Sequence, residues 1–324
     1  MHVLITGGAG FIGSHLTDAF LTRGDRVTIL DDLSTGNRDN LAAALRSPHT
    51  RFVQGRVEDP EVMDPLMREC DAVVHFAAVV GVDLVVRDPV RTIETNVHGT
   101  EQVLRLAVKH GRRVLLASSS EVYGRANSAA FNEADDLVIG PPTHFRWVYA
   151  ASKALDEYLA FAFAKEYGLR ATVVRFFNIV GPRQTGRYGM VLPRFAAQAL
   201  AGTPVRVFGD GEQTRCFCHV QDAVDAVLRL LEREDSVNEI FNIGSPETIS
   251  INCLAQRVIG LAGSASTIDH IPYDQAYAPG FDDMLRRVPD IGKIRALTGW
   301  QPRHTLDDII RDVITTLRSG VAQA

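Results

Sequence analysis

The chain has 324 residues, of which 46% are hydrophobic and 23% charged, a composition typical of an ordinary globular protein with one large or two modest cores. Its formal net charge of −5 indicates no basic surface, so we expect no nucleic-acid partner. No apolar run reaches the roughly 18 residues that a membrane span needs, so we expect no contact with a membrane.

Cysteine usage and the first residues indicate a reducing compartment. The four cysteines are too few and too scattered for a disulfide framework, and no His/Cys cluster has the spacing of metal ligands. The first residues run directly into a strand pattern, without the basic region, apolar stretch and cleavage site of a signal peptide. We therefore expect a cytoplasmic protein with reduced thiols and no bound metal.

Short apolar runs alternate with helical patterns along the first half of the chain. The predicted strands are residues 2–6, 27–30, 51–54, 72–77, 114–118 and 171–175. The predicted helices between them include residues 13–23, 91–110 and 149–167. Strands that are apolar on both faces and alternate with helices are typical of the α/β class, and they predict a Rossmann-type doubly wound parallel sheet.

After Asn178, prolines and glycines break the chain into shorter pieces, which indicates a second, smaller α/β domain that binds the substrate. We expect the first domain to span residues 1–177, with residues 217–244 returning to it. The second domain would then contain residues 178–216 and 245–324.

A glycine-rich turn follows the first predicted strand. Gly7, Gly10 and Gly13 form the pattern G-x-x-G-x-x-G between that strand and a helix. Glycines allow a tight turn and the close approach of a pyrophosphate, and the helix N-terminus supplies free N–H groups. Asp31 follows 18 residues after Gly13, at the end of the second strand, where an acid receives ribose hydroxyls. This arrangement favours NAD over NADP.

Tyr149 and Lys153 are separated by one helical turn, so both side chains lie on one helix face. A tyrosine hydroxyl with a pKa of about 10 is a poor base at neutral pH. We expect the lysine ammonium and the nicotinamide cation to lower that pKa, so that the phenolate can take a hydroxyl proton. The serines at residues 118–120 can supply a hydroxyl to the same reacting oxygen.

As an ordered set, these motifs resemble the extended short-chain dehydrogenase/reductase superfamily. The segments that carry the resemblance are residues 6–13, 31–34, 75–78, 96–100, 118–124, 149–153 and 175–178. Within the superfamily the chain resembles nucleotide-sugar epimerases, and most of all bacterial UDP-glucuronate 4-epimerases and UDP-glucuronate decarboxylases.

This resemblance implies a tightly held NAD that is recycled within each turnover. Tyr149 would be the base, Lys153 its electrostatic partner and a ribose ligand, and Ser119 or Ser120 would contact the substrate hydroxyl. The implied catalytic residues are Tyr149, Lys153, Ser119, Ser120 and Glu121.

The resemblance also implies a set of NAD-binding residues. They are Gly7, Gly10, Phe11, Ile12, Gly13, Asp31, Asp32, Ser34, Val57, Ala77, Asn96, Tyr149 and Lys153. Where the family often has Gly-Asp-Ile or Gly-Asp-Val, this chain has Gly55-Arg56-Val57, so we expect Val57 and backbone groups to contact the adenine.

The second half resembles the part of the family that binds the nucleotide. Residues 207–215 resemble the segment that packs against the nucleobase and sends an arginine to the diphosphate, and two guanidiniums suit a diphosphate because they form charge-assisted, bidentate bonds. The implied substrate ligands are Asn178, Arg187, Val207, Phe208, Arg215 and Arg287.

Three reactions share oxidation at C4 of the sugar as their first step. A dehydratase needs an Asp-Glu pair where this chain has Ser120-Glu121, which argues against dehydration. The segment Ser119–Gly124 is closer to the Thr-Ser-Glu-Val-Tyr-Gly of UDP-glucuronate decarboxylases. Against decarboxylation stands Arg187, flanked by Gly186 and Gly189, which could clamp the C6 carboxylate and twist it away from the C4 ketone.

We therefore expect a UDP-hexuronate 4-epimerase that converts UDP-glucuronate to UDP-galacturonate. The alternatives are a decarboxylase that forms UDP-xylose, a UDP-glucose 4-epimerase, and a non-enzymatic NAD-responsive binding module, since fold alone does not establish activity. The helices at residues 91–110 and 149–167 carry apolar stripes on more than one face. The family pairs such helices between subunits, which predicts a homodimer.

Overall fold

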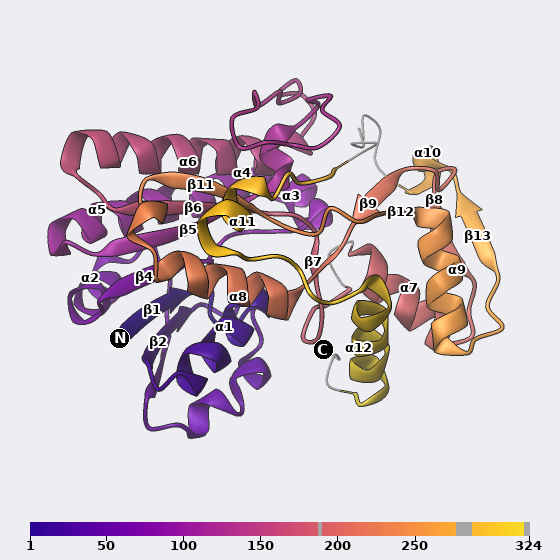
Figure 1. Ribbon diagram of the computed structural model, residues 1–324, viewed down its shortest axis with the longest axis horizontal. Coiled ribbons are helices and arrows are strands. Elements are labelled where there is room, and N and C mark those ends of the chain that lie inside the picture. Colours follow the sequence, from indigo (N-terminus) through magenta and orange to yellow (C-terminus); the bar gives the residue numbers. More distant parts are fainter. Residues whose placement is uncertain (187–189, 277–286, 321–324) are drawn as a thin grey trace.

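The computed structural model describes residues 1–186, 190–276 and 287–320, and in this part of the chain a seven-stranded parallel sheet forms the centre (Figure 1). Its strand order is β11-β6-β5-β4-β1-β2-β3. The strands are β1 (His2–Thr6), β2 (Arg26–Asp31), β3 (Thr50–Gln54), β4 (Ala72–His75), β5 (Arg113–Ser119), β6 (Ala171–Phe176) and β11 (Glu239–Ile243). The prediction of a Rossmann-type α/β fold is confirmed.

Helices cover both faces of the sheet because its side chains alternate between two apolar cores. Val3 and Ile5 of β1 face one core, and Leu4 faces the other. The first core is closed by α1 (Phe11–Thr22), α8 (Val220–Leu231) and α11 (Gly292–Thr298). The second is closed by α2 (Pro60–Glu69), α5 (Gly99–His110) and α6 (Trp147–Tyr167).

The helix predicted at residues 91–110 consists of three pieces. They are α4 (Pro89–Ile93), a π-helical turn over Glu94–His98, and α5. A π-turn widens a helix locally, and this one carries the buried Asn96, whose amide bonds to the backbone of Val79. Hydrophobic periodicity cannot reveal such an interruption, because apolar side chains continue on both sides of it.

A second group of elements packs beside the sheet, on the right in Figure 1, around its own core. Its helices are α7 (Val191–Leu200), α9 (Ile251–Ala262) and α12 (Leu306–Arg318). Its strands pair as β8 (Val205–Phe208) with β13 (Ile268–Ile271), β9 (Thr214–Cys216) with β12 (Thr248–Ser250), and β7 (Ile179–Val180) with β10 (Cys218–His219). The remaining elements are α3 (Val82–Arg87), α10 (Tyr273–Ala276) and the 3-10 turns Arg38–Leu41, Ala44–Arg46, Ser120–Tyr123 and Glu234–Ser236.

The chain passes between the two parts several times. Between β9 and β12 it returns to the sheet, where α8 packs on α1 and β11 pairs with β6 at the sheet edge. It then contributes α9 to the second group, α11 to the sheet and α12 to the second group again. The two parts are thereby linked by several crossings of the backbone.

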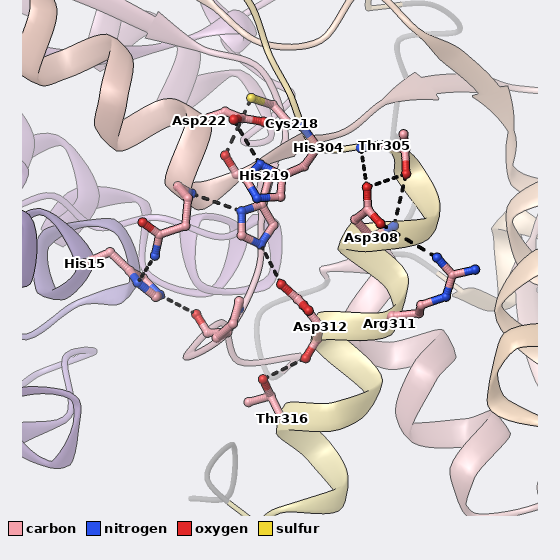
Figure 2. A network of polar contacts seen from close by, with 12 residues as sticks. His15, Cys218, His219, Asp222, His304, Thr305, Asp308, Arg311, Asp312 and Thr316 are labelled. Carbon is pink, nitrogen blue, oxygen red and sulfur yellow. Dashed lines mark hydrogen bonds and ion pairs between the residues drawn. The ribbon is translucent and has the colours of Figure 1, made fainter.

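A network of polar contacts joins the two parts (Figure 2). His15 of α1 donates from Nε2 to the carbonyl oxygen of Pro182 at 2.8 Å and accepts from the Gln221 amide at 3.2 Å. The Gln221 N–H donates to Nδ1 of His219 at 3.2 Å, and Nε2 of His219 faces Asp312 of α12 at 3.3 Å. Burial lowers the pKa of His15 to about 4 and also lowers that of His219, so both imidazoles are neutral near pH 7.

The N-terminus of α8 extends this network toward the C-terminal segment. His304 stacks on His219 with ring centroids 4.2 Å apart and bonds to Asp222 at 2.9 Å. Asp222 also accepts from the backbone N–H groups of Arg303 and His304, and its carbonyl oxygen accepts from the buried indole of Trp300. The segment that leads into α12 is therefore fastened to a helix of the sheet.

The described residues contain neither a membrane-spanning helix nor a cluster of metal ligands. No helix there is long and apolar enough to cross a membrane. No group of three or more His, Cys, Asp or Glu side chains in the same residues is arranged to hold a metal ion.

Candidate active site

A cavity of about 1030 Å³ lies where the carboxyl ends of the strands meet the second group of elements. In parallel α/β sheets, ligands bind at this edge. Among the residues proposed from the sequence, those that line the cavity are Gly7, Gly10, Phe11, Ile12, Gly13, Asp31, Asp32, Ser34, Val57, Ala77, Ser119, Ser120, Glu121, Tyr149, Lys153, Asn178, Phe208, Arg215 and Arg287. Asn96 and Val207 do not line it, and Arg187 lies outside the described residues.

The glycine turn between β1 and α1 is shaped for close approach of a ligand to backbone. Gly7 has a φ of 69°, and a Cβ at Gly13 would lie 2.5 Å from the Gly7 carbonyl oxygen and 2.8 Å from the Gly8 Cα. The N-cap of α1 is Gly10, which has no side chain to bond the first N–H groups of the helix. Those groups therefore face the cavity, where they suit a diphosphate.

Asp31 is held rigidly at the end of β2. Its carboxylate accepts from the backbone N–H groups of Ala9 and Leu33, each at 2.9 Å. Burial raises the pKa of this acid, although both N–H groups act in the opposite direction. Gly36, which the sequence analysis did not single out, is required here because a Cβ would lie 2.8 Å from the Asp31 Oδ1. The glycine turn and this carboxylate together fit the diphosphate and ribose of NAD.

Asn96 braces the site from behind the cavity wall. Its Oδ1 accepts from the Val79 N–H at 2.8 Å, and its Nδ2 donates to the Ser152 Oγ at 3.0 Å. Ser152 in turn donates to the carbonyl oxygen of Tyr149 at 2.9 Å. Asn96 therefore fixes the loop after β4 and the first turns of α6, and it reaches the cavity only through these neighbours.

Val207 also differs from expectation, because side chains alternate along β8. Val207 is fully buried in the core of the second group, whereas Phe208 points to the opposite side and lines the cavity. The Arg194 guanidinium lies 3.9 Å from the centroid of the Phe208 ring. Of the two residues, Phe208 is therefore the one placed to meet a nucleobase.

Tyr149 and Lys153 both face the cavity, but the electrostatics around the tyrosine differ from expectation. Burial, together with the charge of Glu121, raises the pKa of Tyr149, while a hydrogen bond with Ser119 lowers it. The Lys153 ammonium bonds to Asp156 at 3.1 Å. The expectation that Lys153, together with the nicotinamide cation, lowers the pKa of Tyr149 stays a prediction, and in this structure the ammonium is engaged by Asp156.

Glu121 lies between two arginines at the sugar end of the cavity, which we define by Ser119, Glu121, Tyr149, Asn178 and Arg287. Its carboxylate bonds to Arg146 at 2.9 Å and to Arg287. Burial raises the pKa of Glu121, but the charges of Arg287 and then Arg146 outweigh burial and lower it to about 2. The acid is thus fully ionised at neutral pH. Arg287 bonds to Glu121 and lines the cavity, and its expected role at the diphosphate stays a prediction.

Arg146 was missed by the sequence analysis, although a signal for it exists. It precedes Tyr149 by three residues at the start of α6, and residues three apart lie on one helix face. The Tyr-x-x-x-Lys motif begins at Tyr149, so a residue one turn earlier receives no weight.

Two further residues at the cavity wall hold their own loops. Asn178 has a φ of 39°, and its amide donates to the Cys216 carbonyl oxygen at 3.0 Å. Arg183, which has a φ of 67°, pairs with Asp18 of α1 at 2.7 Å. Together with the bond from His15 to Pro182 (Figure 2), this pair fastens the loop after β7 to the helix that follows the glycine turn.

Comparison with known families matches residues 3–244 to the NAD dependent epimerase/dehydratase family. Among curated proteins, the chain is 39% identical to the UDP-N-acetyl-alpha-D-glucosaminuronate decarboxylase of Bacillus cytotoxicus, over 97% of each chain. It is 35% identical to UDP-glucuronic acid decarboxylase 1 of Xenopus tropicalis, over 98% of this chain and 72% of that protein.

Among solved structures, the chain resembles the UDP-glucuronic acid 4-epimerase of Bacillus cereus, which was crystallised in complex with UDP-glucuronic acid and NAD. The two share a TM-score of 0.88 and 26% sequence identity, over 98% of this chain and 99% of that one.

Proposed function

Because this chain belongs to the NAD-dependent epimerase/dehydratase family, we propose that it decarboxylates a UDP-linked hexuronic acid through a 4-keto sugar. Two relatives that align along nearly the whole chain carry the name of UDP-uronic acid decarboxylases, which supports this reaction over the 4-epimerisation that the sequence analysis favours. The observation in the molecule that carries the proposal is the half-buried Glu121 carboxylate beside Tyr149, held by Arg146 and Arg287.

Gly7, Gly13 and Asp31 would hold NAD, which would supply hydride-transfer chemistry at C4 of the sugar. Tyr149 takes the proton of the C4 hydroxyl, and the hydroxyl of Ser119, which is hydrogen-bonded to Tyr149, orients the same oxygen. Once C4 is a ketone, C4, C5 and the C6 carboxylate together form a β-keto acid. The C5–C6 bond then breaks, its electrons move into the ketone, and carbon dioxide leaves. The enolate takes one proton from solvent at C5, and Tyr149 returns its proton to the C4 oxygen.

Glu121 favours the loss of carbon dioxide in two ways. Its charge repels the substrate carboxylate, and this repulsion is relieved when the carboxylate becomes neutral carbon dioxide. It also engages Arg146 and Arg287, whose guanidiniums would otherwise hold the substrate carboxylate in its charged form. An epimerase of a uronic acid needs the opposite arrangement, because it must keep the carboxylate bound and out of line with the ketone.

The UDP part of the substrate fits the opposite wall. Phe208 offers a ring face to the uracil, and the buried Arg215 lines the cavity where it can meet the diphosphate. We propose that residues 1–177 and 217–244 hold NAD, whereas residues 178–216 and 245–324 hold the nucleotide-sugar. The C6 clamp ascribed to Arg187 stays a prediction, and it belongs to the 4-epimerase alternative.

The test is incubation of the purified protein with UDP-glucuronate, and separately with UDP-N-acetylglucosaminuronate, in D₂O, followed by NMR of the sugar. Decarboxylation replaces the C6 carboxylate by hydrogen, so we expect a pentose with one deuterium at C5 and one carbon dioxide per turnover. The substrate that is consumed faster identifies the group at C2.

Each alternative gives a different result. UDP-galacturonate that keeps C6 and carries no deuterium would overturn decarboxylation in favour of 4-epimerisation. Conversion of UDP-glucose to UDP-galactose with neither acid consumed would identify a neutral-sugar epimerase. Absence of turnover with all three sugars, in protein that binds NAD, would favour the binding module. UDP-glucose is also the matched control, because it lacks the carboxylate.

A further inference from the structure

Lys153 and Asp156 form an ion pair inside the protein and not on its surface. The two residues lie three apart on α6, the Nζ–Oδ2 distance is 3.1 Å, and the side chains are 3% and 0% exposed. Pairs at this spacing on a helix are ordinarily solvated and contribute little. A buried pair has a different consequence, because each charge there depends on the other for its stability.

A chain of hydrogen bonds continues behind Asp156 into the sheet. The Ala77 N–H donates to the Thr6 hydroxyl, which bonds to Nδ1 of His75 at 2.7 Å. Nε2 of His75 bonds to the Thr100 hydroxyl at 3.2 Å. The Asp156 Oδ1 is buried and has no hydrogen-bond partner among the described residues, and the Thr100 hydroxyl nearby lowers the pKa of the acid.

The His75 imidazole, in the middle of this chain of hydrogen bonds, is neutral. It is buried between β4 and α5, and burial, followed by the charge of Lys153, lowers its pKa to about 3. The chain from Thr6 to Asp156 therefore supplies hydrogen-bond donors to the carboxylate but no charge. The cation that balances Asp156 is Lys153, which also lines the cavity.

We propose that Asp156 is a positioning residue for the reaction: it holds the Lys153 ammonium away from the Tyr149 hydroxyl and thereby sets the pH above which Tyr149 acts as the base. The inference rests on the proposed function in one respect, namely that Tyr149 is that base. Asp156 acts through Lys153 and does not itself touch the substrate.

The charges around these groups support the direction of the effect. The acids that raise the pKa of Tyr149 are Glu121, on the turn after β5, and Asp156. Glu121 is balanced by Arg146 and Arg287. Among the residues that the structure describes, Asp156 is balanced by Lys153 alone, so removing its charge frees the ammonium for the phenolate.

The remaining neighbour of Asp156 on α6 is Glu157, which is engaged elsewhere. Both of its carboxylate oxygens bond to Arg175, at 2.9 and 2.7 Å, and it also accepts from Ser118. Glu157 therefore does not compete for Lys153, and a change at Asp156 is not masked by the acid beside it.

The experiment is a titration of tyrosinate absorbance near 295 nm in NAD-loaded protein without substrate. The step that is missing from Tyr149→Phe belongs to Tyr149. In Asp156→Asn we expect this step to move to lower pH by about one unit, the size of shift that a nearby charge produces. The acidic limb of kcat/KM should move by the same amount. Asp225→Asn, which removes an exposed acid on α8, should leave the step in place.

Two further variants separate charge from packing. Asp156→Glu keeps the charge and should keep the step within a few tenths of a pH unit of wild type. If Asp156→Asn does not fold, Asp156→Ser removes the same charge with a smaller neutral side chain and should move the step in the same direction. A step that stays in place or moves to higher pH in Asp156→Asn, or in Asp156→Ser as its substitute, would overturn the proposal.

Failure of the proposed function would look different. If wild type and Tyr149→Phe titrate identically, Tyr149 is not the base, and both proposals fall together. If the Tyr149 step is present but does not respond to Asp156→Asn, the role of Asp156 falls while that of Tyr149 stands.

Discussion

The two ends of the cavity are built by different means. At the cofactor end, which we define by Gly7, Gly13 and Asp31, the shape comes from backbone: a turn without side chains and a carboxylate fixed by two N–H groups. At the sugar end, the charge of Glu121 is set by side chains 25 and 166 residues away in the chain. A site made of backbone is inherited with the fold, whereas a site made of distant side chains can change its chemistry while the fold stays constant.

The first prediction concerns the reacting hydroxyl of Tyr149 at the sugar end. Tyr149→Phe removes the hydroxyl that takes the proton, so turnover should fall by about 10²- to 10⁴-fold, while UDP binding, measured by calorimetry, stays within a few-fold of wild type. Tyr158→Phe, at an exposed position on the same helix, is the control and should retain full activity. A Tyr149→Phe protein that keeps more than about a tenth of the turnover, well above the range expected for a lost base, would contradict the assignment.

The second prediction concerns stability at the sugar end. The pKa of Glu121 is about 2 in the folded protein, below its ordinary value of 4.5, so its ion pairs stabilise the folded state above about pH 5. At 1.36 kcal/mol per pKa unit, this difference corresponds to roughly 3 kcal/mol. Glu121→Gln should therefore unfold in less urea than wild type at pH 7.

The pH dependence of this loss provides the check. Protonation of Glu121 removes the stabilisation as the pH falls from about 4.5 toward 2, so the gap between the two proteins should narrow over that interval. Urea titrations at pH 7, 5, 4 and 3 would measure it. A gap of constant size at all four pH values would show that packing, and not charge, carries the effect.

The third prediction concerns the glycine turn at the cofactor end. In Gly13→Ala the new Cβ would meet backbone atoms of Gly7 and Gly8, which cannot move aside as a flexible side chain can. We expect a loss of about 1–3 kcal/mol in the free energy of unfolding and a lower NAD content after purification. Gly260→Ala on α9 is the matched control, because nothing lies within 4 Å of its Cβ, and it should stabilise the protein by about 0.4–1 kcal/mol. Equal NAD content in both variants would count against the glycine turn as the diphosphate site.

The comparison of these two ends also shows what the sequence can and cannot predict. Gly7, Gly13 and Asp31 were predicted because a strand, a turn and a helix that follow one another determine where such residues lie. The partners of Glu121 were not, because no local pattern connects residue 121 to residue 287. The expectation that Val207 faces the substrate differs from the structure for a smaller reason. A difference of one position along a strand reverses which side chain faces the cavity.

The last prediction should affect neither end of the cavity. Large apolar side chains are exposed on α4 and α6, with Val90 at 64% and Tyr158 at 68%. The homodimer stays a prediction, and light scattering of the 35.5 kDa chain tests it. We expect about twice that mass for wild type and the monomer mass for Tyr158→Glu, with turnover per chain nearly unchanged. A monomer in wild type at micromolar concentration would rule the dimer out.

The polar network of Figure 2 has a consequence for synthesis of the chain on the ribosome. His15 is made early, but its two partners, Pro182 and Gln221, follow 167 and 206 residues later, and the partner of His219 on α12 comes later still. A nascent chain therefore carries the glycine turn long before the loop beside the cavity can be fastened. Such distant contacts slow folding and leave apolar surface open to chaperones in the meantime. Trp300, which bonds to α8, lies near the C-terminal end of the chain, so this face of the sheet is completed late in synthesis.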